Sequence, residues 1–207
     1  MTLVRFGYGA SLAMDAGPEL LEETIAGDLV GQRVVTFRSQ EDQVHYLRQL
    51  VSEATPLASI RARARDIVFR IHNAPQRNHA AYAVAIAKWV QANIQYVNES
   101  PEVFQEPTAT LAMGYGDCDD FVTLVAALVE ALGIETQIVG MEWEHPDTGR
   151  AFQHIFSRAV IPMAGPMAGG RNWYIPLDTT LQRPIEDLTD PIKLAMQMGH
   201  DVRVVIA

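Results

Sequence analysis

The sequence predicts a single α+β domain, in which helices come first and an antiparallel sheet follows. Apolar residues recur at helical spacing in four segments, which are residues 40–54, 58–71, 79–97 and 118–132. After Gly133 the period changes, and three further segments read as strands, which are residues 135–143, 152–161 and 172–178. Helices followed by neighbouring antiparallel strands are typical of α+β domains.

The first third of the chain combines short strands with helices. Residues 2–9 and 32–38 are apolar or alternate, as short strands do. Residues 40–54 follow with apolar side chains every three or four positions, which predicts a helix with one buried face. Residues 58–71 give a second helix, and we interpret its arginines as a solvated face because the chain as a whole is acidic.

The middle of the chain contains the two most apolar helices. Residues 79–97 are alanine-rich with one broad apolar stripe, which indicates a buried amphipathic helix. Residues 98–108 contain two prolines, and we expect a loop there. The next helix begins at about Cys118 and runs to Leu132, because Gly133 is a typical C-terminal stop.

The last third predicts a sheet and a tail. We expect a turn at residues 145–149, a flexible loop at 162–170, and a possible edge strand at 201–207. The whole chain, residues 1–207, then forms one domain. Its expected parts are N-terminal strands and helices that pack on the core (1–78), the core itself (79–185), and a C-terminal tail (186–207).

Composition excludes several classes of protein. The net charge of −9 argues against nucleic-acid binding, which depends on basic residues. No stretch approaches the ~18 apolar residues that cross a bilayer, and Gly7, Gly9 and Asp15 interrupt any signal-like segment. One cysteine permits no internal disulfide, so nothing marks the protein as secreted. We expect no membrane partner, and by default a cytoplasmic or phage-associated location.

The single cysteine, Cys118, lies in the segment GYGDCDDF among three aspartates. With Asp117 as N-cap and Asp120 three positions later, Cys118 becomes the first helical residue. A helix N-terminus lowers the pKa of a thiol from its reference of ~8.5, because it stabilises the thiolate. The neighbouring carboxylates oppose this effect. A reactive Cys118 therefore requires a cation close by, most simply an imidazolium.

Of the six histidines, His154 is the one inside a predicted strand, where it shares a face with Phe152 and Phe156. An imidazole near the helix start can act as base to the thiol. Asp178 ends the following strand, where a carboxylate can hold the second ring nitrogen. A lone cysteine is usually a buried small hydrophobe, but a polar helix start is a poor place for one.

The segments GDCDDFVTLVAALVEALGIETQIV, FQHIFSRAV and NWYIPLDTT, over roughly residues 79–185, resemble the transglutaminase-like superfamily of papain-fold cysteine enzymes. They are similar to short bacterial and prophage members called transglutaminase-like cysteine peptidases. The resemblance implies Cys118 as nucleophile, His154 as general base and acid, and Asp178 as orienting carboxylate. It implies a papain-like core in which the catalytic cysteine starts a helix packed on an antiparallel sheet.

The expected function is cysteine-dependent hydrolysis of an amide in a protein or peptide, through a thioester and without a required cofactor. Two alternatives stay open: a protein-crosslinking transglutaminase, and an inactive interaction or phage-assembly module on the same fold. Calcium held by Asp117 and Asp119 is a further alternative, which some bacterial proteinases of the superfamily suggest. Three side chains could assist the Cys118 N–H in binding the oxyanion, and the sequence does not choose between Tyr96, Gln105 and Tyr115.

Overall fold

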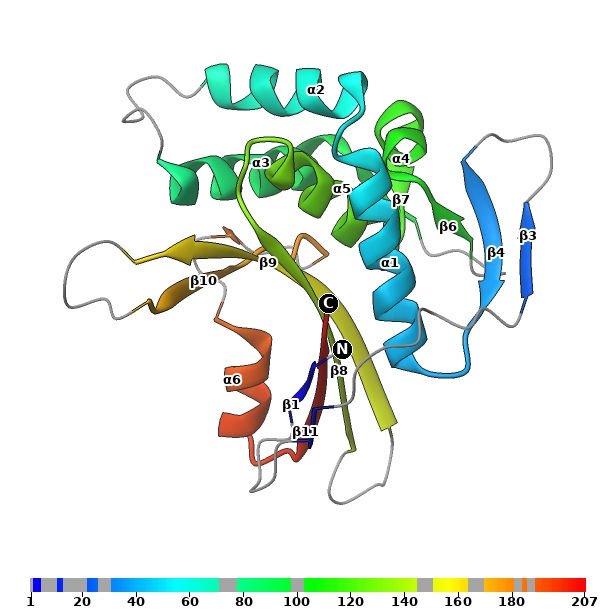
Figure 1. Ribbon diagram of the computed structural model, residues 1–207, viewed down its shortest axis with the longest axis vertical. Helices are drawn as coiled ribbons and strands as arrows, with labels where there is room; N and C mark the ends of the chain where they lie inside the picture. Colours follow the sequence, from blue (N-terminus) through cyan, green and yellow to red (C-terminus); the bar gives the residue numbers. More distant parts are fainter. Residues whose placement is uncertain are drawn as a thin grey trace.

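A six-stranded sheet is the largest element of the computed structural model (Figure 1). The structure describes residues 2–4, 11–12, 22–25, 31–70, 78–97, 103–144, 151–163, 170–180, 184–185 and 189–207. The strands of the sheet are β1 (Thr2–Val4), β2 (Ser11–Leu12), β8 (Thr136–Glu144), β9 (Ala151–Pro162), β10 (Asn172–Pro176) and β11 (Val202–Ile206). Their order is β10–β9–β8–β11–β1–β2, and all neighbours are antiparallel.

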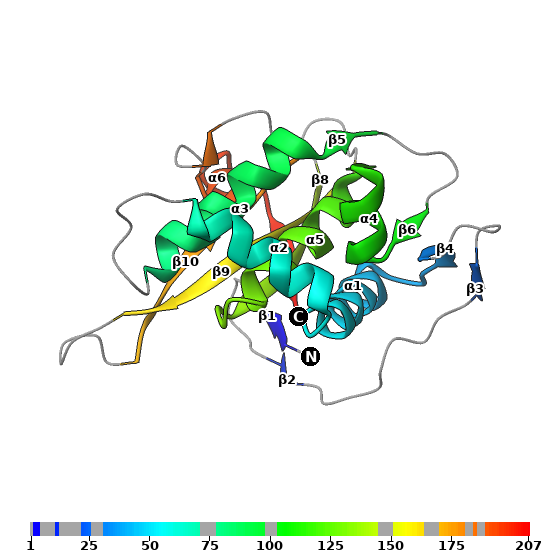
Figure 2. The same ribbon diagram turned by 90° about the horizontal axis from the view of Figure 1, so that it is seen from above.

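The helices lie mainly on one side of this sheet. They are α1 (Gln40–Ala54), α2 (Ala58–Phe69), α3 (His79–Asn93), α4 (Pro107–Met113), α5 (Cys118–Glu130) and α6 (Pro191–Gln197). The first five helices form one group in Figures 1 and 2, and Figure 1 shows α6 apart from them, beside the C-terminal strand β11.

The two faces of the sheet belong to two different cores, because side chains alternate along a strand. On β9, Ile155 and Ala159 join the larger core, which contains α1, α2, α3 and α5. Phe156 points the other way, into a smaller core that includes Ile192 of α6. The centre of the sheet is therefore buried on both faces, as its continuous apolar runs require.

Two small sheets bring distant segments to the start of α5. The strands β3 (Glu22–Ile25), β4 (Gln32–Thr36) and β6 (Phe104–Gln105) form one antiparallel sheet. The strands β5 (Gln95–Tyr96) and β7 (Tyr115–Gly116) pair in parallel. Since β7 directly precedes α5, this pairing places the end of α3 beside the first turn of α5.

Local chemistry sets the ends of several helices. The Ser39 hydroxyl accepts a hydrogen bond from the Asp42 backbone N–H at 3.2 Å, and Asn78 caps α3 in the same way at Ala81. The helix α4 begins with a proline at its first position, where no N–H is needed. It ends at Gly114, whose φ of 73° suits glycine best.

Most of the predicted elements are present in the structure. The α+β class is confirmed, and α1 has the predicted bounds. The segments predicted as strands after Gly133 form β8, β9 and β10, and residues 32–38 contain β4. The predicted turn at 145–149 lies outside the described residues, as does most of the predicted strand at 2–9 and of the loop at 162–170.

Three predictions were wrong. The helix predicted over 79–97 ends at Asn93, because Ile94 is extended and the chain then enters β5. The predicted loop at 98–108 contains β6 and the beginning of α4, two elements too short to produce a periodic pattern. The predicted edge strand at 201–207 is β11, which lies inside the sheet because β1 pairs with its outer side. The sequence also did not predict α6.

Candidate active site

The N-terminus of α5 is built around the carboxylate of Asp117. One oxygen of this carboxylate accepts hydrogen bonds from the backbone N–H groups of Asp119 at 3.1 Å and Asp120 at 3.4 Å. The Asp120 carboxylate accepts in return from the Asp117 N–H at 3.2 Å, which completes a capping box. Cys118 is the first residue of the helix, as predicted, and its side chain is partly exposed.

Backbone segments pack closely against this helix start. The second Asp120 oxygen accepts from the Gln105 N–H of β6 at 2.8 Å. A Cβ added to Gly116 would lie 2.7 Å from Asp120, so the approach of β7 to the helix requires glycine. The position of Cys118 is thus set by a hydrogen bond from β6 and by the close approach of β7.

The acidic residues around the cysteine have different roles. Asp117 and Asp120 bind backbone N–H groups, whereas Asp119 contacts the sulfur, with Cys118 Sγ 3.7 Å from Asp119 Oδ1. The other Asp119 oxygen accepts from Gln43 Nε2 of α1 at 2.7 Å. Asp119 therefore lies between the sulfur and α1, and it is the carboxylate that directly opposes a thiolate.

His154 and Asp178, the other two predicted residues, are in direct contact. His154 Nε2 lies 2.6 Å from Asp178 Oδ2, and the Asp178 side chain is only 1% exposed. The second Asp178 oxygen accepts from the Thr180 hydroxyl at 2.7 Å and from the Thr180 N–H at 3.3 Å. The imidazole stacks on buried Phe156, with ring centroids 5.8 Å apart, and is itself 24% exposed. This arrangement fixes the ring orientation and leaves Nδ1 as the nitrogen available for a proton transfer.

Helix α1 links the cysteine to the strand that carries the histidine. Gln43 binds Asp119, and its neighbour Val44 packs so closely on β8 that a Cβ added to Gly140 would lie 2.7 Å from it. Gly140 pairs with Ile155 on β9, next to His154. The β9–β10 pairing begins at Arg158, so β9 is not paired with β10 at His154.

The three side chains considered for the oxyanion differ in their surroundings. Gln105 is fully buried, and its amide Nε2 lies 3.4 Å from the Tyr115 carbonyl oxygen. Tyr115 is partly buried in the strand before the cysteine. Tyr96 is 48% exposed and packs edge-on against Phe121, one helical turn after Cys118, with ring centroids 5.8 Å apart. Tyr96 is thus the accessible phenol beside the first turn of α5.

Sequence reasoning missed Gln43 and Thr180, the side chains that hold Asp119 and Asp178. Gln43 precedes its partner by 76 residues, and no local pattern connects them. Thr180 ends the segment NWYIPLDTT, and a hydroxyl two residues after an aspartate is a recognisable turn signal.

The described residues contain no group of three or more histidine, cysteine, aspartate or glutamate side chains that could hold a metal ion. Calcium at Asp117 and Asp119 remains a prediction. In the same part of the chain, no helix is long and apolar enough to cross a membrane.

Comparison with known proteins gives one family, and the solved structures that match include two proteases. The family model described as "Transglutaminase-like superfamily" matches residues 65–178, more than half of the chain. A "putative protease" from Parabacteroides distasonis ATCC 8503 is 16% identical with a TM-score of 0.45, over 70% of this chain and 31% of that one. A "putative cysteine protease" from Cytophaga hutchinsonii is 18% identical with a TM-score of 0.42, over 72% and 47%. The chain thus spans less than half of either protein, and comparison with curated proteins gave no match.

Proposed function

Because the chain belongs to the transglutaminase-like superfamily of cysteine-dependent enzymes, we propose that it hydrolyses an amide bond through a thioester on Cys118. The observation that carries the proposal is the contact between His154 and buried Asp178, in a chain whose single cysteine begins a capped helix. The substrate class is a protein or peptide, and the reaction requires no cofactor.

The proposed reaction begins with transfer of the thiol proton to His154 Nδ1. Asp178 holds the Nε2–H on the opposite side of the ring, so Nδ1 is the nitrogen that accepts the proton. The sulfur attacks the amide carbonyl carbon, and the π electrons move to oxygen. When the C–N bond breaks, the leaving amine takes the proton from Nδ1. Water then attacks the thioester with His154 as base, and releases the carboxylic acid and the thiol.

The proposal assigns the Cys118 backbone N–H to the oxyanion, since the next two N–H groups bind the Asp117 carboxylate. We assign the second donor to the Tyr96 hydroxyl. Its partial exposure and its packing on Phe121 support this choice over buried Gln105.

The function is tested by incubating the protein with a complex peptide mixture, with and without a primary amine such as methylamine. We expect new carboxyl and amino termini in water, detected by mass spectrometry, and no such products with Cys118→Ala. Products that carry the added amine in preference to water would indicate a transglutaminase. Absence of both kinds of product would contradict the enzymatic proposal and favour an interaction module.

The role of Tyr96 has its own test. In Tyr96→Phe, acylation of Cys118 by p-nitrophenyl acetate should be about 10²-fold slower, because one oxyanion donor is lost. Alkylation of the same thiol by iodoacetamide should keep its rate, since that reaction forms no oxyanion. Both rates are measured by stopped-flow absorbance and mass spectrometry. Equal acylation rates in the wild type and Tyr96→Phe would mean that another group is the second oxyanion donor. Tyr115→Phe is the matched comparison.

A further inference from the structure

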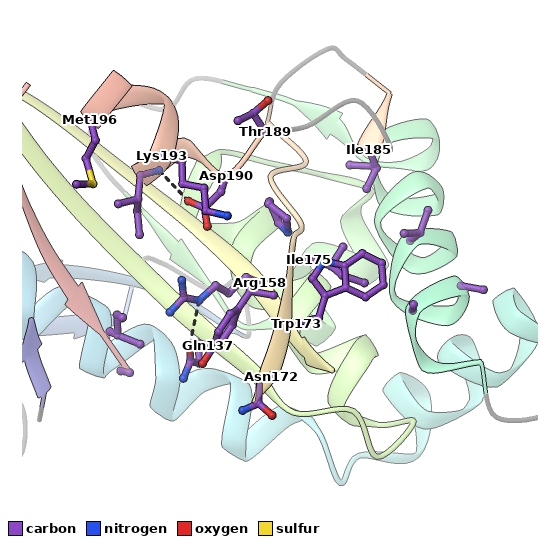
Figure 3. A pocket seen from close by; sticks show the side chains of 18 of the residues that line it. Gln137, Arg158, Asn172, Trp173, Ile175, Ile185, Thr189, Asp190, Lys193 and Met196 are labelled. Atoms are coloured by element: carbon purple, nitrogen blue, oxygen red, sulfur yellow. Dashed lines mark hydrogen bonds between the residues drawn. The ribbon is translucent and has the colours of Figure 1, made fainter. Parts of the chain in front are cut away.

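A cavity of about 1300 Å³ lies around β10, between α3 and α6 (Figure 3). Its lining includes residues from α3, β8, β9, β10, α6 and the C-terminus, but none of the three residues proposed to catalyse. Arg158 and Gln137 line one part of it together, close to Asp190 and Lys193 in the figure. The cavity is thus separate in its residues from the site described above.

Arg158 is the most unusual group in this cavity. It is partly buried, its Nε donates to Gln137 Oε1 at 2.9 Å, and its guanidinium lies over the Tyr174 ring, 4.3 Å from the centroid. Burial lowers the pKa of Arg158, and the charges of Asp190 and Tyr174 act in the opposite direction. An ion pair requires a carboxylate oxygen within about 4 Å of a guanidinium nitrogen. Among the described residues, no carboxylate forms such a pair with Arg158.

A partly buried guanidinium that forms no ion pair with a described carboxylate favours an anionic ligand, because such an ion replaces the lost hydration. With Nε bound to Gln137, the two terminal nitrogens of Arg158 remain for an oxygen pair, which is the geometry of a carboxylate. The charged side chains that line the cavity are those of Arg158, Lys193 and Asp190, and the C-terminal residue Ala207 lines it as well. Beside Asp190, a monoanion is favoured over a dianionic phosphate, because repulsion from the aspartate increases with the charge of the ligand.

The rest of the lining on this side is suited to an apolar group. Tyr174 lies under the guanidinium, and Ile192 and Met196 of α6 line the same cavity. Ligand sites commonly combine an apolar lining with a few convergent polar groups. We propose that the cavity binds a monocarboxylate with an apolar body, such as the C-terminal residue of a peptide, with its carboxylate on Arg158.

The test uses Cys118→Ala protein, so that binding is measured without any reaction and independently of the proposed function. Titration calorimetry compares N-acetyl-L-leucine, its uncharged analogue N-acetyl-L-leucinamide, and the peptide acetyl-Gly-Gly-Leu. We expect the acid to bind at least about 10-fold more tightly than the amide, since a charge-assisted contact is lost in the amide. Tighter binding of the peptide than of the single acid would identify a peptide C-terminus as the ligand. Equal binding of both would identify a small carboxylic acid.

Substitutions at Arg158 separate the carboxylate contact from packing. Arg158→Met should weaken binding of the acid about 10–100-fold and leave the amide unchanged. Arg158→Lys keeps the charge but not the planar guanidinium. Its affinity for the acid should therefore lie between those of the wild type and Arg158→Met. Arg203→Met is the matched control, because Arg203 is exposed and pairs with Glu142 outside the cavity. Thermal unfolding verifies that each variant is folded, and Arg158→Gln replaces any that is not. Equal affinity for acid and amide, no binding of either, or equal effects of the Arg158 and Arg203 variants would overturn the proposal.

Discussion

Alkylation of Cys118 by iodoacetamide is expected to reach half of its maximal rate at a pH well below ~8.5, the reference for a free thiol. The proposed mechanism has two features that favour the thiolate: the position of Cys118 at the N-terminus of α5 and an ion pair with His154. In His154→Ala the half-maximal pH should move upward, because the cation that offsets Asp119 is removed. The rate against pH, followed by mass spectrometry, measures both effects.

Two further variants sharpen this experiment. His154→Gln retains a polar side chain and should behave as His154→Ala does, which excludes an effect of the empty space. Asp119→Asn removes the carboxylate 3.7 Å from the sulfur, so the half-maximal pH should fall below that of the wild type. Half-maximal values near ~8.5 or above in both the wild type and His154→Ala would contradict a thiolate–imidazolium pair. The protein would then be better regarded as a non-catalytic module on this fold.

Acylation of Cys118 by p-nitrophenyl acetate should be about 10²–10⁴-fold slower in Asp178→Asn than in the wild type. The reason lies in Thr180, whose backbone N–H and hydroxyl both donate to the same oxygen of Asp178. An asparagine must therefore turn its carbonyl oxygen to Thr180 and its NH₂ group to His154 Nε2. The imidazole would then carry its proton on Nδ1, and it could no longer accept the proton of the thiol.

The controls for this prediction come from the same contact. Thr180→Val removes the hydroxyl but keeps the backbone N–H, so acylation should decrease less than in Asp178→Asn. Circular dichroism and thermal unfolding show whether the buried asparagine is tolerated. An acylation rate in folded Asp178→Asn equal to that of the wild type would mean that Asp178 is a structural residue of the strand end and does not position His154.

Helices and strands were predictable where a long segment repeats one period. The 15 residues of α1 show this for helices, and the strands after Gly133 show it for the sheet. Short elements were not predictable in this way. The two residues of β6 are a strand because β4 pairs with them, and Asp190, which caps α6, resembles any turn aspartate in the sequence.

The contacts of the candidate site also differ in whether the sequence predicts them. The capping box of α5 joins residues three positions apart, and such local contacts can be read from the order of residues. The contact between His154 and Asp178 was expected from strands that follow each other in sequence and pair in space. The hydrogen bond from Gln43 to Asp119 joins two residues that are 76 positions apart and lie on different helices, and no sequence pattern indicates it.

By itself, the sequence determined that a lone cysteine begins a capped helix, that a histidine lies on one strand and an aspartate just after its neighbour, and that the fold is α+β. Only the tertiary structure decided which aspartate contacts the sulfur, that β11 lies inside the sheet, and that Arg158 lines a cavity together with Gln137 and Tyr174. The physical reason is the distance along the sequence over which each interaction acts. Backbone capping and periodicity act over a few residues, whereas the partner of a buried side chain depends on how distant elements pack.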